Sequence, residues 1–298
     1  MSPIFKITLL VLAVLLIVGL VVAHFSAPYI IIKRARQASS PDETPAKFGL
    51  DFEKISIKTV DNLHLQAFYI PSALDDAYAT ILLLHGIGSR KENLLPLAAF
   101  LANEGYNCLA LDSRAHGESE GNYITFGYFE KQDISSVIDY LEKEKGLTNI
   151  GIRGTSMGGA IALLSLAHDK RLKFGIIEST FADLSQVVFD YQKLWLGLES
   201  RIISNYTLQR AAKIAKFTVK EIKPAEVAKE VTQPVFYAHG DADENISVEY
   251  GKEIFKNLAS SHKEMVIVEE AGHENLAAIG GVDYRKRMLA FLEKYRGE

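Results

Sequence analysis

The segment IGIRGTSMGGAIALLSLA, residues 150–167, places one serine between a short apolar run and a longer helical one. The run Ile150–Ile152 predicts a buried strand, and the residues after Gly158 have the length and composition of a helix. Ser156 stands at the junction, with glycine two residues before it and two residues after it. Such small neighbours let strand and helix approach closely on a strained turn. The segment therefore predicts an elbow that carries Ser156 as a nucleophile.

The same pattern of two glycines around a serine occurs a second time, at Ser119. That match follows a polar loop, residues 112–116, and leads into Asn122 and Tyr123 without a helix start. The context therefore separates the two serines. We interpret Ser119 as a loop residue and Ser156 as the nucleophile.

A serine hydroxyl needs a base to take its proton, and the base needs an acid that orients it. In a fold with this elbow, the order along the chain is serine, acid, histidine. Two histidines follow at suitable positions. His262 lies in a polar connection and is expected at the surface, whereas His273 directly follows the last predicted strand. His273 is the predicted base.

The acid is expected after the preceding strand, which ends at Ala238. Three acidic residues compete in the loop that follows. Asp241 is expected to cap the turn and Glu244 to lie near the N-terminus of the next helix. Asp243 is therefore the predicted acid, and Asp183, after an earlier strand, is the alternative.

Two backbone N–H groups directed at one point are needed to stabilise an oxyanion. Met157, the residue after the nucleophile, is predicted to supply one of them. The second is expected from Ile87, in the segment 84–89 that ends an apolar strand with two glycines. This chemistry requires no cofactor, and no group of Cys and His residues has the spacing of a zinc site.

Strands and helices alternate along the rest of the chain. Two amphipathic segments, 52–59 and 63–70, predict a hairpin. Short apolar runs predict six buried parallel strands, at 81–84, 108–111, 150–152, 174–177, 235–238 and 265–268. Helical patterns lie between them, at 92–104, 128–144, 157–167, 248–258 and 284–295. The expected fold class is α/β: a mostly parallel eight-stranded sheet with helices on both faces.

The chain divides into three expected regions. Residues 1–36 are expected to form an N-terminal membrane anchor with a basic flank, residues 37–49 a polar tether, and residues 50–298 the α/β domain. Within that domain, residues 181–229 hold aromatic residues in helical surroundings and no predicted strand. This stretch predicts a helical cap over the mouth of the sheet.

The N-terminal run is apolar enough to enter a membrane. From Ile7 to Val22 only Thr8 and Gly19 interrupt it, and its length approaches the roughly 20 residues that cross a bilayer. A cleaved signal peptide followed by secretion is the alternative, because residues 21–23 resemble a cleavage site. The run is, however, longer than the apolar core of most signal peptides. We expect an uncleaved, single-pass anchor.

Composition excludes other classes of protein. The net charge is −4, and Lys and Arg are scattered rather than gathered on one face, which argues against a nucleic-acid partner. The single cysteine, Cys108, lies in an apolar run and is expected to be buried.

Five segments, in this order, resemble motifs of the serine α/β-hydrolase superfamily. They are His85–Gly88, Asp112–Ser119, the Ser156 elbow, His239–Asp243 and Gly272–His273. The resemblance implies the α/β-hydrolase fold and acyl-transfer chemistry. With the anchor, residues 123–130 look like a bacterial, membrane-anchored branch related to monoglyceride-lipase-like and prolyl-oligopeptidase-like enzymes. Ala115 departs from the family's D-x-R-G-H-G-x-S loop, where glycine is usual.

The expected function is hydrolysis of carboxylic esters through an acyl-enzyme on Ser156, with a small-molecule ester or amide, lipid-like ones included, as substrate. An amidase or peptidase on the same residues is one alternative. A catalytically silent, membrane-tethered binding protein is an alternative of another class. Dehalogenase and epoxide-hydrolase chemistry are disfavoured because both require a carboxylate at position 156.

One helical face in the cap bears on the substrate. Tyr191, Leu194, Trp195 and Leu198 share it by their spacing. The simpler expectation is that this face packs onto the body of the fold. The alternative is that part of it overhangs Ser156 and forms an apolar acyl pocket.

Overall fold

Eight strands form where the apolar and alternating segments predict them. A computed structural model describes residues 2–33, 36–37 and 42–295. Its strands are β1 (Glu53–Lys58), β2 (His64–Ile70), β3 (Thr80–Leu84), β4 (Asn107–Leu111), β5 (Ile150–Thr155), β6 (Leu172–Glu178), β7 (Val235–Gly240) and β8 (Lys263–Val268). They make one sheet in the order β1-β2-β4-β3-β5-β6-β7-β8. β1 and β2 run antiparallel, as does β2 to β4, and the remaining pairs are parallel. The predicted fold class is confirmed.

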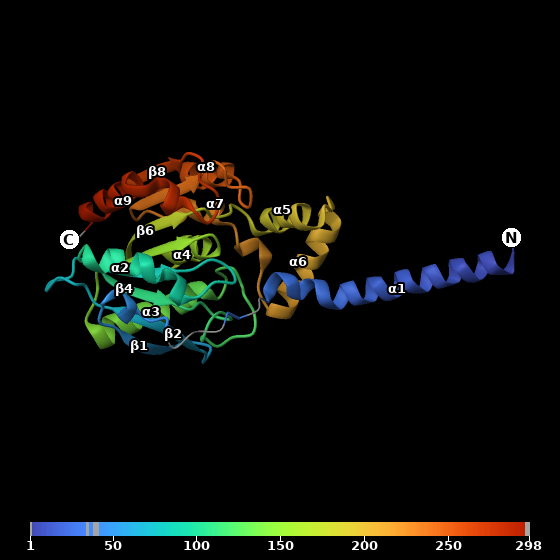
Figure 1. The fold of residues 1–298 in the computed structure, drawn as a ribbon, viewed down its shortest axis with the longest axis horizontal. Helices are drawn as coiled ribbons and strands as arrows, with labels where there is room; N and C mark the ends of the chain where they lie inside the picture. Colours follow the sequence, from blue (N-terminus) through green and yellow to red (C-terminus); the bar gives the residue numbers. More distant parts are fainter. Residues whose placement is uncertain (1, 34–35, 38–41, 296–298) are drawn as a thin grey trace.

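Helices cover both faces of the sheet, as Figure 1 shows. On one face, α2 (Leu95–Asn103) and α9 (Leu276–Lys294) pack on a core that includes Phe174 and Phe236. The other face carries three helices, α3 (Glu130–Lys145), α4 (Met157–His168) and α8 (Val248–Asn257). Strands buried on both sides explain why their sequences are continuous apolar runs.

Helix α9 is longer than its sequence pattern predicts. It begins at Leu276 rather than near residue 284 and is kinked at Gly281, where φ is +52°. The kink rotates the second half relative to the first, so one helical period does not run through the whole helix. The pattern therefore reveals only the half after the kink.

The stretch 181–229 contains helices and no strand, and all of it is described by the structure. Helix α5 (Leu184–Leu196) and helix α6 (Arg201–Ala215) project beyond the edge of the sheet. The short helix α7 (Pro224–Val227) instead packs against α4 and α8, in the body of the fold. Two 3-10 turns, η3 (Val219–Glu221) and η4 (Ala228–Glu230), flank α7. We use the word cap for residues 183–223.

Helix α1 (Pro3–Ile32) is the one helix, among the described residues, long and apolar enough to cross a membrane. Its first turns project away from the body, and its last turns pack beside α6 (Figure 1). Ile32 is fully buried, and its carbonyl accepts a hydrogen bond from the N–H of Ile124. Beyond the helix, the Arg36 guanidinium donates to the carbonyls of Gly117 and Gly121. The end of α1 is thus part of the folded body.

Candidate active site

Ser156 lies between β5 and α4 in a backbone conformation that side chains rarely adopt. Its φ is +55° and its ψ is −122°. The Ser156 N–H donates to the carbonyl of Glu178 on β6, and the Thr180 hydroxyl donates to the carbonyl of Ser156. A methyl group at Gly154 would lie 2.1 Å from the carbonyl oxygen of Gly158, so only glycine fits. The elbow's glycines are required by the close approach of strand and helix.

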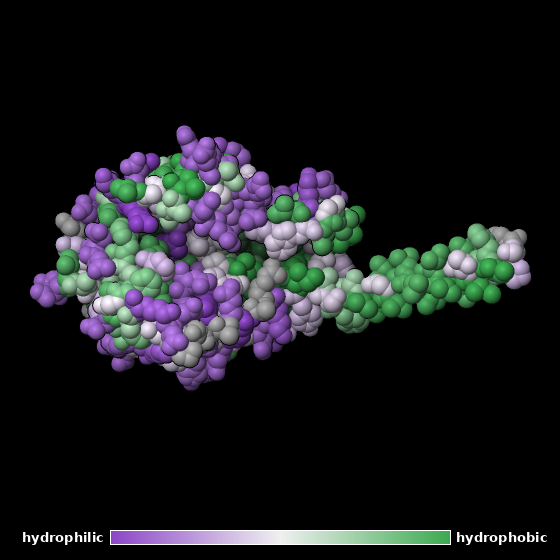
Figure 2. Space-filling view, in the orientation of Figure 1, coloured by the Kyte–Doolittle hydropathy of each residue, from purple (hydrophilic) through white to green (hydrophobic). Residues whose placement is uncertain are grey.

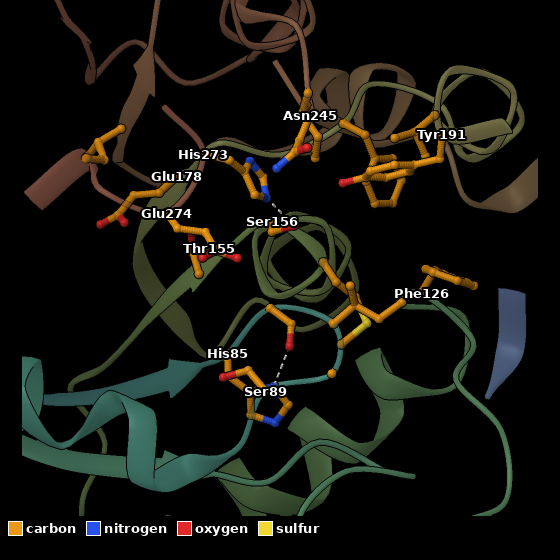
Figure 3. Close-up of a pocket in the computed structure, with 18 of the residues that line it drawn as sticks. His85, Ser89, Phe126, Thr155, Ser156, Glu178, Tyr191, Asn245, His273 and Glu274 are labelled. Atoms are coloured by element: carbon orange, nitrogen blue, oxygen red, sulfur yellow. Dashed lines mark hydrogen bonds between the residues drawn. The ribbon is translucent and has the colours of Figure 1, made fainter. Parts of the chain in front are cut away.

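The structure brings the three predicted side chains together. The Nε2 atom of His273 lies 3.0 Å from Ser156 Oγ, and its Nδ1 atom lies 2.7 Å from Asp243 Oδ2. Ser156 follows β5, Asp243 follows β7 and His273 follows β8, so all three stand at the carboxyl edge of the parallel strands. Figure 3 shows the imidazole of His273 directed at Ser156.

Asp243 is held as a carboxylate. Burial by itself raises the pKa of Asp243, but hydrogen bonds from His239, His273 and the Ile246 N–H outweigh it, and the net pKa lies well below the ordinary value of 3.8. An ionised Asp243 accepts a hydrogen bond from the Nδ1–H of His273, which leaves the Nε2 lone pair for the serine hydroxyl. In this arrangement His273 Nε2 is placed to accept the proton of the Ser156 hydroxyl.

His239 is a second histidine on Asp243, and sequence reasoning did not identify it. Its ring is fully buried, donates from Nε2 to the carbonyl of Ile246 at 2.9 Å, and lies 3.3 Å from Asp243 Oδ2. His239 therefore fixes the loop that presents Asp243. Its position at the end of a buried strand was visible in the sequence, but its partners were not.

The competing candidates lie elsewhere. Asp241 Oδ1 accepts a hydrogen bond from the N–H of Glu270, so it binds the loop after β8 rather than its own turn. Asp183 caps the N-terminus of α5, where it accepts from the N–H of Ser185. His262 precedes β8, at the opposite edge of the sheet from His273.

The loop after β3 lies against the elbow. A methyl group at Gly86 would be 3.5 Å from Ser156 Cβ. The N–H of Gly88 donates to His116 Nε2 at 3.0 Å, and the N–H of Ser113 donates to His85 Nε2 at 3.1 Å. Burial, together with the neighbouring His116, lowers the pKa of His85 to about 3, so its ring stays neutral and can accept.

The two predicted oxyanion donors flank this site. Ile87, in the loop after β3, and Met157, the first residue of α4, both line the cavity that contains Ser156. Because the first N–H groups of a helix have no partner within the helix, the Met157 N–H is available to a ligand.

The loop with the second glycine-serine-glycine match has a structural role. Ser119 is fully buried; its hydroxyl donates to the carbonyl of Asp112 at 2.6 Å and accepts from the N–H of Gln66 at 2.8 Å. Ala115, which replaces the usual glycine, has a φ of +61°. That conformation costs a non-glycine residue roughly 1–2 kcal/mol.

A cavity of about 1140 Å³ contains Ser156 and His273. Its polar side is formed by Arg153, Glu178, Glu274, Tyr284 and Arg285. Its apolar side is formed by Phe126, by Val188, Tyr191 and Trp195 of α5, and by Ala27, Ile30 and Ile31 of α1. Figure 3 shows Glu178 and Glu274 on one side of Ser156, with Tyr191 and Phe126 on the other. The contribution of α1 was not predicted from the sequence.

The cap face does not pack onto the body as a whole. Leu194 and Trp195 are 49% and 58% exposed, while Tyr191 is partly buried against the core. Tyr191, Trp195 and Leu198 line the cavity. The simpler expectation therefore holds for Tyr191 and is wrong for Leu194 and Trp195, because α5 projects beyond the edge of the sheet. Among the described residues, no group of three or more His, Cys, Asp or Glu is placed to hold a metal ion.

Known proteins resemble this chain in sequence and in fold. A family model described as serine aminopeptidase, S33, matches residues 75–224. The uncharacterized protein YqkD of Bacillus subtilis is 29% identical over 297 residues, covering 93% of this chain and 92% of YqkD. The esterase Pf2001 of Pyrococcus furiosus superposes with a TM-score of 0.74 at 24% identity, over 89% of this chain and 100% of the esterase. A bacterial membrane phospholipase A superposes with a TM-score of 0.61 at 21% identity, over 98% of this chain and 100% of the phospholipase.

Replacing each of the two serines distinguishes a catalytic role from a structural one. Ser156→Ala should lower kcat for a chromogenic butyrate ester by about 10⁴–10⁶ and leave the melting temperature unchanged. Ser119→Ala should retain kcat but lower the free energy of unfolding by about 1–3 kcal/mol, because buried partners lose their hydrogen bonds. Loss of activity in Ser119→Ala with a functional Ser156→Ala would reverse the assignment.

Replacing the two candidate acids by their amides tests which one serves His273. Asp243→Asn should lower kcat by about 10⁴, because an amide no longer holds the imidazole in the required tautomer. Asp183→Asn is the matched control: asparagine also caps helices, so both kcat and the melting temperature should stay near wild type. Equal losses in the two variants would contradict the role given to Asp243.

Proposed function

The chain belongs to the serine aminopeptidase (S33) family of α/β-hydrolases, and on that premise we propose that it is a membrane-anchored serine hydrolase that cleaves carboxylic esters. The observation that carries the proposal is the hydrogen-bonded series Ser156–His273–Asp243, with contacts of 3.0 and 2.7 Å. Serine, histidine and carboxylate in this series are the groups that acyl transfer requires.

In the first half of the reaction, His273 Nε2 takes the hydroxyl proton while Ser156 Oγ attacks the ester carbonyl. The N–H groups of Ile87 and Met157 stabilise the resulting oxyanion. The protonated imidazole then gives its proton to the leaving alcohol, and the acyl group remains on Ser156. The negative charge of Asp243 stabilises the imidazolium throughout.

The second half repeats these steps with water. His273 takes a proton from a water molecule, and the hydroxide attacks the acyl-enzyme. The acid product leaves when Ser156 Oγ recovers the proton from His273. No bound cofactor takes part in either half.

The lining of the cavity favours esters with an apolar acyl group over peptides. Aliphatic and aromatic side chains line one side of it, as in sites that recognise acyl groups. The N-terminal ammonium group of an aminopeptidase substrate would need a carboxylate as partner. Of the two glutamates that line the cavity, Glu178 is already bound by Arg153 Nε at 3.2 Å and by the Tyr284 hydroxyl at 2.6 Å, while Glu274 is exposed. An amidase or peptidase on the same residues is the second candidate, which the family's name favours.

Helix α1 fits an anchor that is retained. Its 30 residues span about 45 Å, against about 30 Å for the hydrocarbon core of a bilayer. The excess length corresponds to the last turns, which pack on the body, where Pro28 and Ile32 are buried. A cleaved signal peptide remains the alternative.

A substrate panel tests the reaction class. The full chain should hydrolyse acetyl, butyryl and octanoyl esters of p-nitrophenol and leave aminoacyl p-nitroanilides intact. A fluorophosphonate probe should label wild-type protein and not Ser156→Ala. Turnover of the anilides alone would favour the peptidase, and no labelling of folded protein would favour a silent binding protein.

Membrane attachment is tested on the expressed protein. The full chain should remain in the membrane fraction after a carbonate wash, and its mass should include residues 1–23. Recovery of a protein that begins near His24 would instead establish a cleaved signal peptide.

A further inference from the structure

An exposed apolar surface lies at the end of the cap. It consists of seven side chains from the end of α5, the connecting loop and the start of α6, which we call the cap tip: Leu194, Trp195, Leu196, Leu198, Ile202, Ile203 and Tyr206. Ile202 is 83% exposed and Trp195 58%. Figure 2 shows hydrophobic side chains gathered there, on the side of the molecule from which α1 projects. Such clustering on a protein surface marks a contact site.

Helix α1 places this surface at a defined height. The ring of His24 contacts the hydroxyl of Tyr206, so α1 meets the cap tip at residue 24. From Pro3 to His24 the helix rises about 32 Å, close to the 30 Å hydrocarbon thickness of a bilayer. A bilayer that encloses the exposed part of α1 therefore ends at the level of the cap tip.

The chemistry of the cap suits that level. Trp195 and Tyr206 belong to the residue types that gather at membrane interfaces. Residues 183–223 contain seven Lys or Arg and four Asp or Glu, a charge of +3 in a chain whose total is −4. Basic segments beside a membrane are attracted to anionic lipids.

The cavity of Ser156 opens at the same surface. Trp195, Leu196 and Ile203 are exposed at the cap tip and also line the cavity. Ile30 and Ile31 of α1 line the same cavity. An apolar path therefore leads from the end of α1 to the serine.

We propose that the cap tip is a second membrane contact and that the substrate is a glycerolipid held in the same bilayer, whose acyl chain enters the cavity between α1 and the cap. This rests on the proposed ester hydrolysis. The acyl group passes from the glycerol oxygen to Ser156 Oγ, the glycerol hydroxyl leaves with the proton from His273, and water then releases the fatty acid. An acyl chain that enters directly from the bilayer is never exposed to water on its way to the cavity. Such exposure would be unfavourable and would oppose binding.

The sole tryptophan of the chain reports on the contact directly. In vesicles of phosphatidylcholine and phosphatidylglycerol, the fluorescence of Trp195 in the full chain should have its maximum at a shorter wavelength than that of a water-exposed indole. Lipids brominated near the glycerol should quench it more than lipids brominated near the chain end, because the tip lies at the interface. Emission typical of a water-exposed indole, quenched by acrylamide and by neither lipid, would overturn the proposal.

Two substitutions at the cap tip test delivery of the substrate. Leu194 and Ile202 do not line the cavity. The double variant Leu194→Asp, Ile202→Asp should hydrolyse a fluorogenic glycerolipid in these vesicles at least about tenfold more slowly, because two charges weaken interfacial binding. Its kcat/KM for soluble p-nitrophenyl acetate should be unchanged.

Leu74→Asp is the matched control. Leu74 is 45% exposed, similar to Leu194, but lies between β2 and β3, at the sheet edge opposite Ser156. It should change neither rate. Equal rates on vesicle lipid for wild type and the double variant would overturn the lipid-entry proposal while the acetate rate still supports ester hydrolysis. Failure of wild type to cleave the acetate ester would instead refute the proposed function.

Discussion

The close approach of β5 and α4 at residues 154–158 is the constraint on which the rest of the site depends. Ser156 can hold a φ of +55° only because the flanking glycines let the helix start directly above the strand. A methyl group at Gly158 would lie 2.7 Å from the carbonyl oxygen of His85, so the same glycine also admits the loop after β3. One steric requirement thus sets both the position of the Ser156 hydroxyl and the position of the Ile87 segment beside it.

Parallel topology supplies the other members of the site. Because β5, β7 and β8 run in the same direction, the loops that carry Ser156, Asp243 and His273 emerge at one edge of the sheet, although 117 residues separate the serine from the histidine. Buried imidazoles hold two of the neighbouring loops. His239 binds the Asp243 loop, and His116 accepts the N–H of Gly88. Hydrogen bonds of buried side chains therefore hold the loops at the base of the site.

The anchor, the cap and the cavity meet at one corner of the molecule. The last turns of α1 pack on α6 and at the same time form part of the cavity wall. An N-terminal helix that served only as a tether would need no such contacts. Here its last turns contribute to the apolar side of the cavity. The same helix therefore serves both the proposed attachment to the membrane and the proposed binding of an apolar substrate.

The sequence by itself determined the eight strands, the Ser156 elbow and the candidates Asp243 and His273, because each depends on local pattern: apolar runs, flanking glycines and position after a strand. It did not reveal the role of His239, the half of α9 before the kink at Gly281, or the exposure of Trp195. The first half of α9 escapes the pattern because the kink interrupts the helical period, whereas His239 and Trp195 depend on contacts between residues far apart in the chain. The same holds for Ile30 and Ile31 of α1, which look like any other residues of an apolar helix. The sequence pattern assigns an apolar side chain to a helix or a strand. Only the packing of these elements decides whether the side chain meets the core, the cavity or the surface.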